Sequence, residues 1–176
     1  MHFIQFFYFL FSFVMAQKLL YEPNAPDYKS NSASQSLFDK LAPDPSLSTF
    51  MDVLTQVEDV FNLMNHTNAD NSQLYTVFCP VNSAFRNELD IYTRSHLDDF
   101  LRNHIVPNIK FDSDSLAQTD SLHTMFPGQS IPVRYDSSSQ KIILNEHTVV
   151  DTSHPVEAIN GIAYKIDHLL RPNMDE

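Results

Sequence analysis

The spacing of the apolar residues differs between the two halves of this chain, and this difference limits the fold more than any other feature. In the first half, apolar positions recur every three or four residues, as on one face of a helix: Leu47, Phe50, Leu54, Val57, Phe61 and Met64. Later, every second residue is a large apolar one, as in a strand: Ile131, Val133 and Tyr135, then Ile162, Tyr164 and Ile166. Helices followed by strands predict an α+β fold with a largely antiparallel sheet.

Smaller elements lie between these two regions. Residues 74–79 form a predicted strand, which Pro80 ends because proline cannot donate to a sheet. A helix follows, with Ser95 as its expected N-cap, while Ser46 or Ser48 is expected to cap the first helix. Two more short apolar runs predict strands: residues 141–144 and 148–150.

The first sixteen residues predict a signal peptide, although the usual basic start is missing. They are apolar and uncharged, with Val14 and Ala16 at the −3 and −1 positions of a cleavage site after Ala16. The run from Phe3 to Ala16 has 14 residues, short of the roughly 20 that a membrane helix needs. An uncleaved anchor is the alternative. We expect cleavage, entry into the secretory pathway and no membrane span in the mature chain.

The rest of the sequence divides into a leader, one domain and a tail. Residues 17–46 are rich in Ser, Asn, Pro and Asp, which predicts a mobile leader. Residues 47–172 form the predicted domain, and residues 173–176 a tail without a lipid-anchor or ER-retention signal. The expected location is the secretory lumen and then either the vacuole or the cell exterior, between which the sequence does not choose.

The charge balance and the cysteine count argue against whole classes of function. The chain has 22 acidic and 11 basic residues, a net charge of −11, so it offers few cations to nucleic acids or anionic membranes. Cys79 is the only cysteine, so the core forms without an intrachain disulfide. Because Cys79 lies in an apolar run, we expect a buried, inert thiol rather than a reactive one.

Eight histidines raise the question of a metal site, but none of the usual paired spacings is present. The closest trio in sequence is His147, His154 and His168. No metal and no cofactor is predicted. A luminal hydrolase is the rival interpretation, and it requires a compact cluster of His104, Asp167 and His168, or of His147 and His154.

Asn65-His66-Thr67 is the only sequon for N-linked glycosylation in the chain. It follows directly after the apolar helix pattern, at the start of a polar loop rich in turn-forming residues. In a protein that enters the secretory pathway, we expect Asn65 to be glycosylated.

Three segments stand out by their order and separation. Residues 76–85, TVFCPVNSAF, contain one set of characteristic positions: Thr76, Phe78, Pro80, Asn82 and Phe85. Residues 160–172, NGIAYKIDHLLRP, contain a second set: Asn160, Gly161, Asp167 and Pro172. Between them, His104 is followed by two apolar residues and Pro107. The first two segments resemble the first and second signatures of fasciclin domains, and the third is similar to the central Tyr-His motif of that family.

The resemblance covers residues 47–172 and implies a wedge of mostly antiparallel strands with several helices packed on it. It also implies a role in cell adhesion or matrix contacts, although the family usually has tandem domains and a membrane anchor. The chain looks most like the small single-domain fungal type, some of which reside in the vacuole. Cys79 replaces the usual alanine, and Asn103 replaces the tyrosine before His104, which weakens any transfer of the integrin binding linked to that region.

The motif residues also have structural explanations. We expect Asn82 to cap the turn into the next helix, and Gly161 to let the backbone turn after Asn160. Asp167 is expected to bond nearby amides. His104 is expected to be buried and hydrogen-bonded within the domain.

The function that these observations predict is non-catalytic binding of a protein or glycan partner, as in adhesion. Affinity would come from exposed apolar residues on one edge of the domain. Weak self-association is left open, because a single domain needs a second binding face to bridge two surfaces. The alternatives are the luminal hydrolase and a luminal structural protein without a fixed partner.

Overall fold

The computed structural model describes residues 34–67, 73–86 and 91–171. The strands of this part form one sheet, in the order β2-β1-β7-β6-β5-β4-β3. Their bounds are β1 Tyr75–Pro80, β2 Ile105–Pro107, β3 Ser121–His123, β4 Ser130–Asp136, β5 Lys141–Leu144, β6 Thr148–Ala158 and β7 Gly161–Ile166. Neighbouring strands are antiparallel except β1 and β7, which are parallel. The predicted α+β fold with a largely antiparallel sheet is confirmed.

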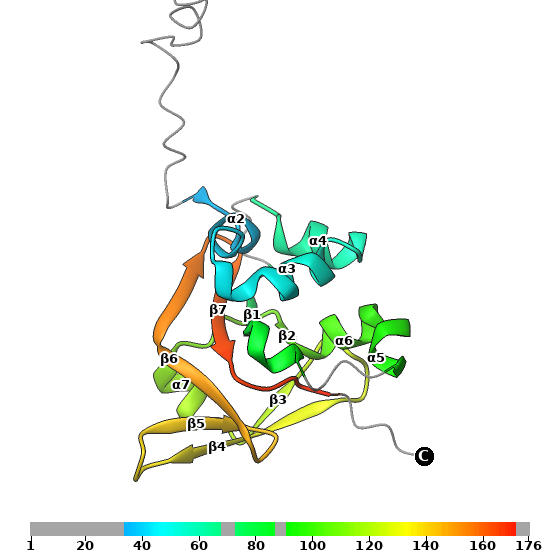
Figure 1. Cartoon of the computed structure of the whole chain (residues 1–176). Helices are drawn as coiled ribbons and strands as arrows, with labels where there is room; N and C mark the ends of the chain where they lie inside the picture. Colours follow the sequence, from blue (N-terminus) through cyan, green and yellow to red (C-terminus); the bar gives the residue numbers. More distant parts are fainter. Residues whose placement is uncertain (1–33, 68–72, 87–90, 172–176) are drawn as a thin grey trace, which may run out of the picture. The chain divides into compact units, whose positions relative to one another are not determined.

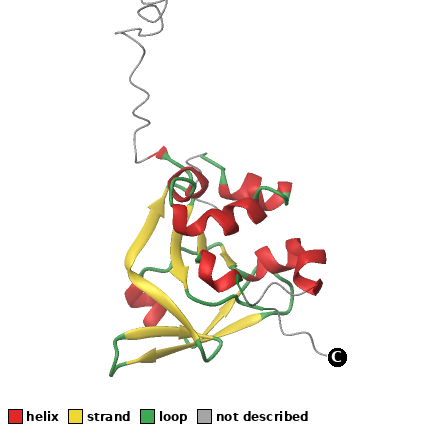
Figure 2. Cartoon of the chain, viewed as in Figure 1, coloured by secondary structure: helices red, strands yellow, loops and turns green. Residues whose placement is uncertain are grey.

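Most of the helices pack on one side of this sheet (Figures 1 and 2). Their bounds are α2 Leu37–Leu41, η2 Pro45–Leu47, α3 Ser48–Leu54, α4 Glu58–Met64, η3 Asn82–Phe85, α5 Ile91–Ser95, α6 Leu97–Asn103 and α7 Ser113–Ala117, where η marks a 3-10 helix. No helix within the described ranges is long and apolar enough to cross a membrane.

The buried apolar residues form two clusters on opposite faces of β7. Ala163 belongs to the cluster beneath the helices, and its neighbours Ile162 and Tyr164 belong to the other. The second cluster lies inside a curl of the sheet, whose two outermost strands, β2 and β3, lie against each other. Beyond β3, the backbone N–H of Met125 donates to the carbonyl oxygen of Ile105 in β2 at 2.8 Å.

The prediction of a mobile leader over residues 17–46 is wrong for its last third. Ser36 caps α2 with a capping box: its Oγ accepts from the N–H of Asp39 (3.0 Å), and Asp39 Oδ2 accepts from the N–H of Ser36 (3.3 Å). Leu37 and Leu41 lie one turn apart and are buried in the cluster beneath the helices. Composition concealed this helix, because Ser, Pro and Asp are also the residues that start helices.

The ordered domain therefore begins before residue 47. The remaining predictions concern the two ends of the chain. The signal peptide 1–16 with cleavage after Ala16, the leader up to residue 33, and the tail 173–176 lie outside the described residues.

The single helix predicted over residues 47–64 is broken in the middle. α3 ends at Leu54 and α4 begins at Glu58, because Val57 has an extended backbone (φ −116°, ψ 96°). Thr55 Oγ1 donates to the carbonyl oxygen of Asp52 at 2.9 Å, near the end of α3. The predicted apolar face is otherwise buried, except that Val57 and Phe61 are only half-buried.

The predicted N-caps are also wrong. Asp44, rather than Ser46 or Ser48, caps the first turn, since its carboxylate accepts from the N–H of Ser46 at 2.9 Å. His96 occupies the N-cap position of α6, and Ser95 is the last residue of α5. Several residues with short polar side chains compete at each of these helix starts, and the sequence alone did not rank them.

Candidate functional site

Thr76 and Phe78 of β1 serve the interior of the domain. Thr76 is fully buried, and its Oγ1 donates to the carbonyl oxygen of Ile109 and accepts from the N–H of Phe111, both at 2.9 Å. These bonds fasten the segment after β2 to the sheet. Phe78 stacks on Tyr164 of β7, with ring centroids 6.2 Å apart. Neither side chain is available to a partner.

Asn82 stabilises a different helix from the one predicted. It begins η3, but its side chain does not cap η3. Its Oδ1 accepts from the N–H of Thr49 (3.0 Å), and its Nδ2 donates to the carbonyl oxygen of Pro45 (2.9 Å) and to Ser48 Oγ (3.0 Å). Asn82 thus ties the start of α3 to the end of β1. Phe85, three residues on, is buried.

Asn160 joins three segments just before β7. Its Oδ1 accepts from the N–H of Leu37 at 2.8 Å, and its Nδ2 donates to the carbonyl oxygens of Leu63 (3.1 Å) and Met64 (2.9 Å). One side chain therefore satisfies free backbone groups at the start of α2 and at the end of α4. The sequence predicted only a turn at Asn160 and Gly161 and missed this contact. Pro172, the last motif position, lies outside the described residues.

His104 is fully buried, and its ring bridges two backbone segments. Nε2 accepts from the N–H of Leu170 (3.0 Å), so the ring proton lies on Nδ1, which donates to the carbonyl oxygen of Phe100 (2.7 Å). Burial lowers the pKa of His104 to about 4. The neighbouring Asn103 donates to the carbonyl oxygen of Leu170 at 2.9 Å. His104 is therefore neutral and structural at ordinary pH.

In the first cluster required by a hydrolase, His104 is not available to a substrate. Both ring nitrogens of His104 are occupied by backbone groups. Asp167 Oδ1 accepts from the N–H of Val149 at 2.8 Å and lies 2.8 Å from His168 Nδ1. Asp167 bonds a neighbouring strand, and it has no serine, threonine or cysteine nucleophile among its described hydrogen-bond partners.

The second histidine set is also divided. His147 and His168 meet edge to face, with ring centroids 5.4 Å apart. His154 instead lies beside Asp151, with 3.4 Å between Nδ1 and Oδ2. Within the part of the chain that the structure describes, no three His, Cys, Asp or Glu side chains are placed to hold a metal ion.

Cys79 is fully buried in β1, directly before Pro80, which ends the strand. Burial raises the pKa of its thiol far above the usual value, and the positive charge of Lys165 offsets this only in part. A thiol in this state forms no thiolate at ordinary pH. Cys79 is a core residue without nucleophilic chemistry.

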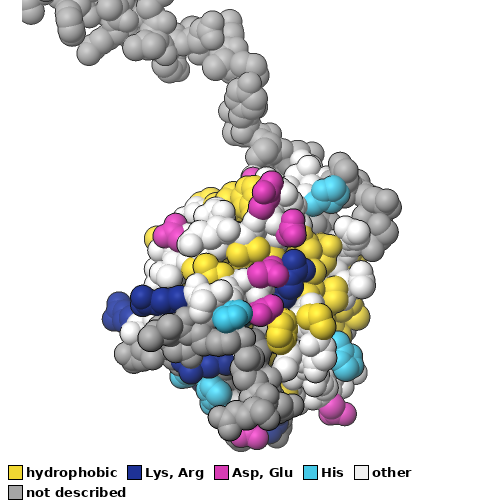
Figure 3. Space-filling view, turned by 90° about the vertical axis from the view of Figure 1, so that its right-hand side faces the viewer, with side chains coloured by type: hydrophobic (Ala, Val, Ile, Leu, Met, Phe, Trp, Pro, Cys, Tyr) yellow, Lys and Arg dark blue, Asp and Glu magenta, His cyan; other side chains and the backbone are white. Residues whose placement is uncertain are grey.

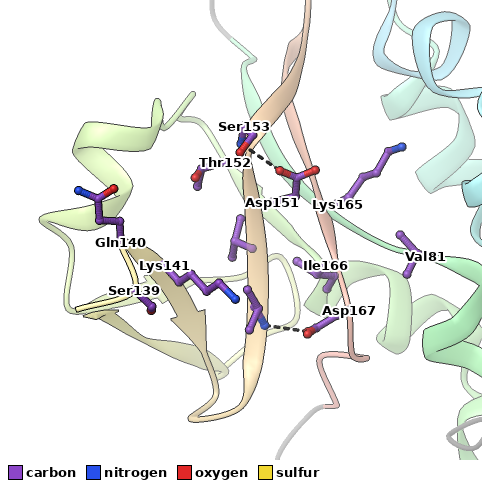
Figure 4. A pocket seen from close by; sticks show the side chains of 12 residues that line it. Val81, Ser139, Gln140, Lys141, Asp151, Thr152, Ser153, Lys165, Ile166 and Asp167 are labelled. Atoms are coloured by element: carbon purple, nitrogen blue, oxygen red, sulfur yellow. Dashed lines mark hydrogen bonds between the residues drawn. The ribbon is translucent and has the colours of Figure 1, made fainter. Parts of the chain in front are cut away.

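A groove of about 530 Å³ lies between the middle of β6, the C-terminal end of β7 and the turn from β4 to β5 (Figure 4). We call it the β6–β7 groove. Its described lining residues are Val81, Ser139, Gln140, Lys141, Val149, Val150, Asp151, Thr152, Ser153, Lys165, Ile166 and Asp167. The sequence did not single out this groove, because strands far apart in the chain supply it.

Two charged residues of the groove, Asp151 and Lys165, do not form the ion pair that their positions suggest. Asp151 and Lys165 are directly opposite in the ladder of β6 and β7. Lys165 Nζ instead contacts Asp44 Oδ2 at 2.5 Å, and its hydrogen bond lowers the pKa of Asp44. Asp151 accepts from the N–H of Ser153 at 3.0 Å (Figure 4), and its Oδ2 lies 3.4 Å from Nδ1 of the His154 ring.

The backbone of β6 bulges beside Asp151. Asp151 is opposite Lys165 and Val156 is opposite Ala163, so residues 152–155 of β6 face a single residue of β7. The extra residues bend the strand, as bulges do, and bring polar side chains into the groove. A proline at position 155 was the signal in the sequence, since proline within a strand marks a bulge or an edge.

A sequence model of the Fasciclin domain matches residues 45–172. This chain belongs to the fasciclin family. The match begins two residues before the domain predicted from the sequence, and it includes each signature segment described above. Fasciclin domains are modules associated with cell adhesion.

Among solved structures, the fasciclin chain is similar to a FAS1 domain pair from the insect cell adhesion molecule Fasciclin I. The TM-score is 0.54 at 18% sequence identity, and the match covers 81% of this chain and 51% of that chain. The chain thus spans about half the length of that structure, and at this identity the likeness shows the fold alone. No curated protein sequence matches the chain.

The β6–β7 groove of this fasciclin domain is suited to polar recognition. The side chains of Asp151 and Asp167 offer carboxylate oxygens. The exposed side chain of Lys141 has no hydrogen-bond or ionic partner among the described residues. None of the described lining residues is aromatic, so the groove lacks the flat apolar surface on which a ring could stack. The described lining therefore offers charged and hydrogen-bonding groups rather than a stacking surface.

Proposed function

We propose that this fasciclin-domain protein is a non-catalytic binding module of the secretory pathway, and that its β6–β7 groove receives a polar segment of a partner protein. The observation that carries the proposal is the ion pair between Lys165 and Asp44 at 2.5 Å. In this ion pair, the ammonium group of Lys165 binds Asp44 instead of Asp151, the residue opposite Lys165 in the ladder of β6 and β7. A carboxylate is left facing the groove, ready for a cationic side chain of the partner.

The charge of the whole chain supports the same kind of partner. A net charge of −11 attracts basic surfaces over long range and speeds their encounter with the domain. Lys141, on the other side of the groove, adds a positive group that would meet an acceptor of the partner. A groove with both signs of charge selects a partner whose charges have the complementary order.

The non-catalytic part of the proposal is supported by the state of the reactive groups. His104 and Cys79 are buried and occupied or inert, and His154 does not join the pair formed by His147 and His168. The rival surface for binding is the helical side of the domain, where hydrophobic side chains form a band between charged residues (Figure 3). The experiment below distinguishes the two surfaces.

A photo-crosslinking residue at Thr152, inside the groove, tests the binding site in the native cell. A matched variant carries the same residue at Asp52, which is exposed on α3 outside the groove. We expect one defined protein to be trapped from Thr152 and not from Asp52. Trapping from Asp52 alone would move the binding site to the helical side.

Conservative changes then test the charges. Asp151→Asn keeps an acceptor for the N–H of Ser153 but removes the charge, and we expect it to weaken binding of the trapped protein about tenfold, equal to about 1.4 kcal/mol. Asp52→Asn removes the same charge outside the groove and should leave the affinity unchanged. Equal affinities of both variants and the wild type would refute the role of Asp151.

The proposed location is tested separately. A C-terminally tagged copy in its own cell is fractionated into medium, wall, vacuole and cytosol. Protein in the medium or the vacuole, shortened by the signal peptide, is the expected result. Full-length protein in the cytosol would contradict the secretory part of the proposal.

A further inference from the structure

We propose that Asn65 carries an N-linked glycan at the end of the domain remote from the β6–β7 groove. This inference rests on the proposed entry into the secretory pathway. The sequon Asn65-His66-Thr67 directly follows α4, and the side chains of all three residues are exposed in the folded domain. An enzyme and a bulky glycan therefore have access to the site, and the folded domain has room for the product.

The side-chain nitrogen of Asn65 is available for modification. Oδ1 accepts from Ser36 Oγ at 3.3 Å, whereas Nδ2 has no hydrogen-bond partner among the described residues. The last carbonyl oxygens of α4 are bonded by Asn160 instead. A sugar on Nδ2 therefore breaks no hydrogen bond of the fold. Oδ1 keeps its bond to Ser36, because the glycosylated amide retains its carbonyl group.

The chemistry needs a lipid-linked oligosaccharide diphosphate as the donor. Nδ2 of Asn65 loses one proton and forms a bond to the anomeric carbon of the first sugar. The bond between that carbon and the diphosphate oxygen breaks, and the lipid diphosphate leaves with the electron pair. No group is oxidised or reduced, and the side chain remains uncharged.

The position of Asn65 separates the glycan from the groove. Asn160, which contacts the end of α4 next to Asn65, directly precedes β7. Lys165 and Asp167, which line the groove, lie at the other end of β7. A strand of this length spans about 20 Å. The glycan would therefore cover the end of the domain where α2 and α4 meet and leave the groove open.

Expression in eukaryotic cells tests the site, with the full chain in two forms. One form has its own N-terminus, and the other has residues 1–16 replaced by a signal peptide of proven function. We expect the secreted second form to lose mass when an amidase releases N-glycans, and mass spectrometry to find Asn65 converted to an aspartate. Asn65→Gln and Thr67→Ala should abolish this shift, whereas Thr67→Ser, which keeps the sequon, should retain it.

The outcomes separate the two proposals. A secreted second form without a glycan would overturn the assignment of Asn65. A glycan on the second form and none on the first would refute the secretory targeting of residues 1–16 and leave the assignment of Asn65 intact.

Labelling with a maleimide carried on a long polyethylene glycol chain tests the position of the glycan. Because Cys79 is buried, one introduced cysteine supplies the reactive thiol. The glycan should slow labelling of Asn62→Cys, on the exposed side of α4, at least several-fold, and should leave the labelling rate of Ser153→Cys in the groove unchanged. Equal slowing at both positions would overturn the separation of glycan and groove.

Discussion

Gly161, the first residue of β7, lies directly against the backbone of Tyr75, the first residue of β1. A Cβ on Gly161 would come within 2.9 Å of the carbonyl carbon and the amide nitrogen of Tyr75, and closer still to its carbonyl oxygen. The φ angle of Gly161, 154°, is also one that residues with side chains rarely adopt. The parallel pairing of β1 and β7 thus begins at a position where only glycine fits.

Gly161→Ala should therefore lower the free energy of unfolding by about 3 kcal/mol or more, through the clash and the backbone strain together. Urea denaturation measures the loss. Gly128→Ala is the matched control, because Gly128 also has a positive φ, 77°, but faces open space. That change should cost only about 1–2 kcal/mol. Equal losses at the two glycines would contradict the steric explanation.

Asn160→Ala should destabilise the domain by at least about 2 kcal/mol, because it leaves backbone groups of Leu37, Leu63 and Met64 without their partner. Protein made in bacteria, which is free of the eukaryotic glycan, is used for the urea titration. Asn65→Gln in the same material should change the stability by less than about 0.5 kcal/mol. A small effect at Asn160 would show that water replaces these bonds.

Replacing either of two buried threonines by valine should change the free energy of unfolding, in opposite directions at the two positions. Thr148 Oγ1 is buried without a hydrogen-bond partner among the described residues, so Thr148→Val should raise the free energy of unfolding by about 1 kcal/mol. Thr76 Oγ1 makes two bonds to backbone groups, so Thr76→Val should lower it by about 2 kcal/mol. Thermal unfolding compares both variants with the wild type. A loss at Thr148 would mean that its hydroxyl has a partner.

The stability of the domain should fall between about pH 6.5 and pH 4 because of His104. Its pKa is about 4 in the fold against 6.5 for an ordinary histidine. In this window the unfolded chain binds more protons at this site than the folded one, so the free energy of unfolding decreases as the pH drops. The contribution of His104 levels off below about pH 4. The whole loss is roughly 3 kcal/mol. Asp44, with a lowered pKa, acts only below about pH 3.8.

Urea titrations at a series of pH values measure this effect. His104→Gln should flatten the profile within the window, although the variant is less stable at every pH. His123→Gln changes an exposed histidine and should leave the profile unchanged. A wild-type profile that is flat between pH 6.5 and 4 would contradict the buried neutral state of His104.

The elements predicted well from the sequence are those with a compact apolar run or a clear apolar period. β1, β5 and β7 belong to this class, as do Leu47, Phe50 and Leu54 of the helical face. The predictions failed where short polar side chains determine the local structure. The capping box of Ser36 and Asp39 makes a helix of a segment that composition assigned to the leader. The break at Val57 depends on backbone angles that the apolar period does not encode.

The candidate groove could not be predicted from the sequence, for a different reason. Its charges come from β5, β6, β7 and the residue after β7. Their availability to a partner depends on the ion pair of Lys165 with Asp44, from a segment more than 100 residues earlier. The motif residues could be recognised in the sequence, but their contacts could not be predicted from it. Asn82 and Asn160 both bond helices distant in sequence, whereas local rules predicted only caps and turns beside them.

β2 and β3 lie against each other, and the hydrogen bond from Met125 to Ile105 closes this contact. The contact affects how the binding surfaces of this domain can evolve. Outer strands are where proteins add strands from other chains, through backbone bonds that any sequence can make. Here β2 and β3 cover each other's edges, so a partner would be recognised there by side chains rather than by backbone hydrogen bonds. Substitutions at the surface can then exchange one partner for another while the backbone stays the same, and accidental polymerisation through these strands is suppressed.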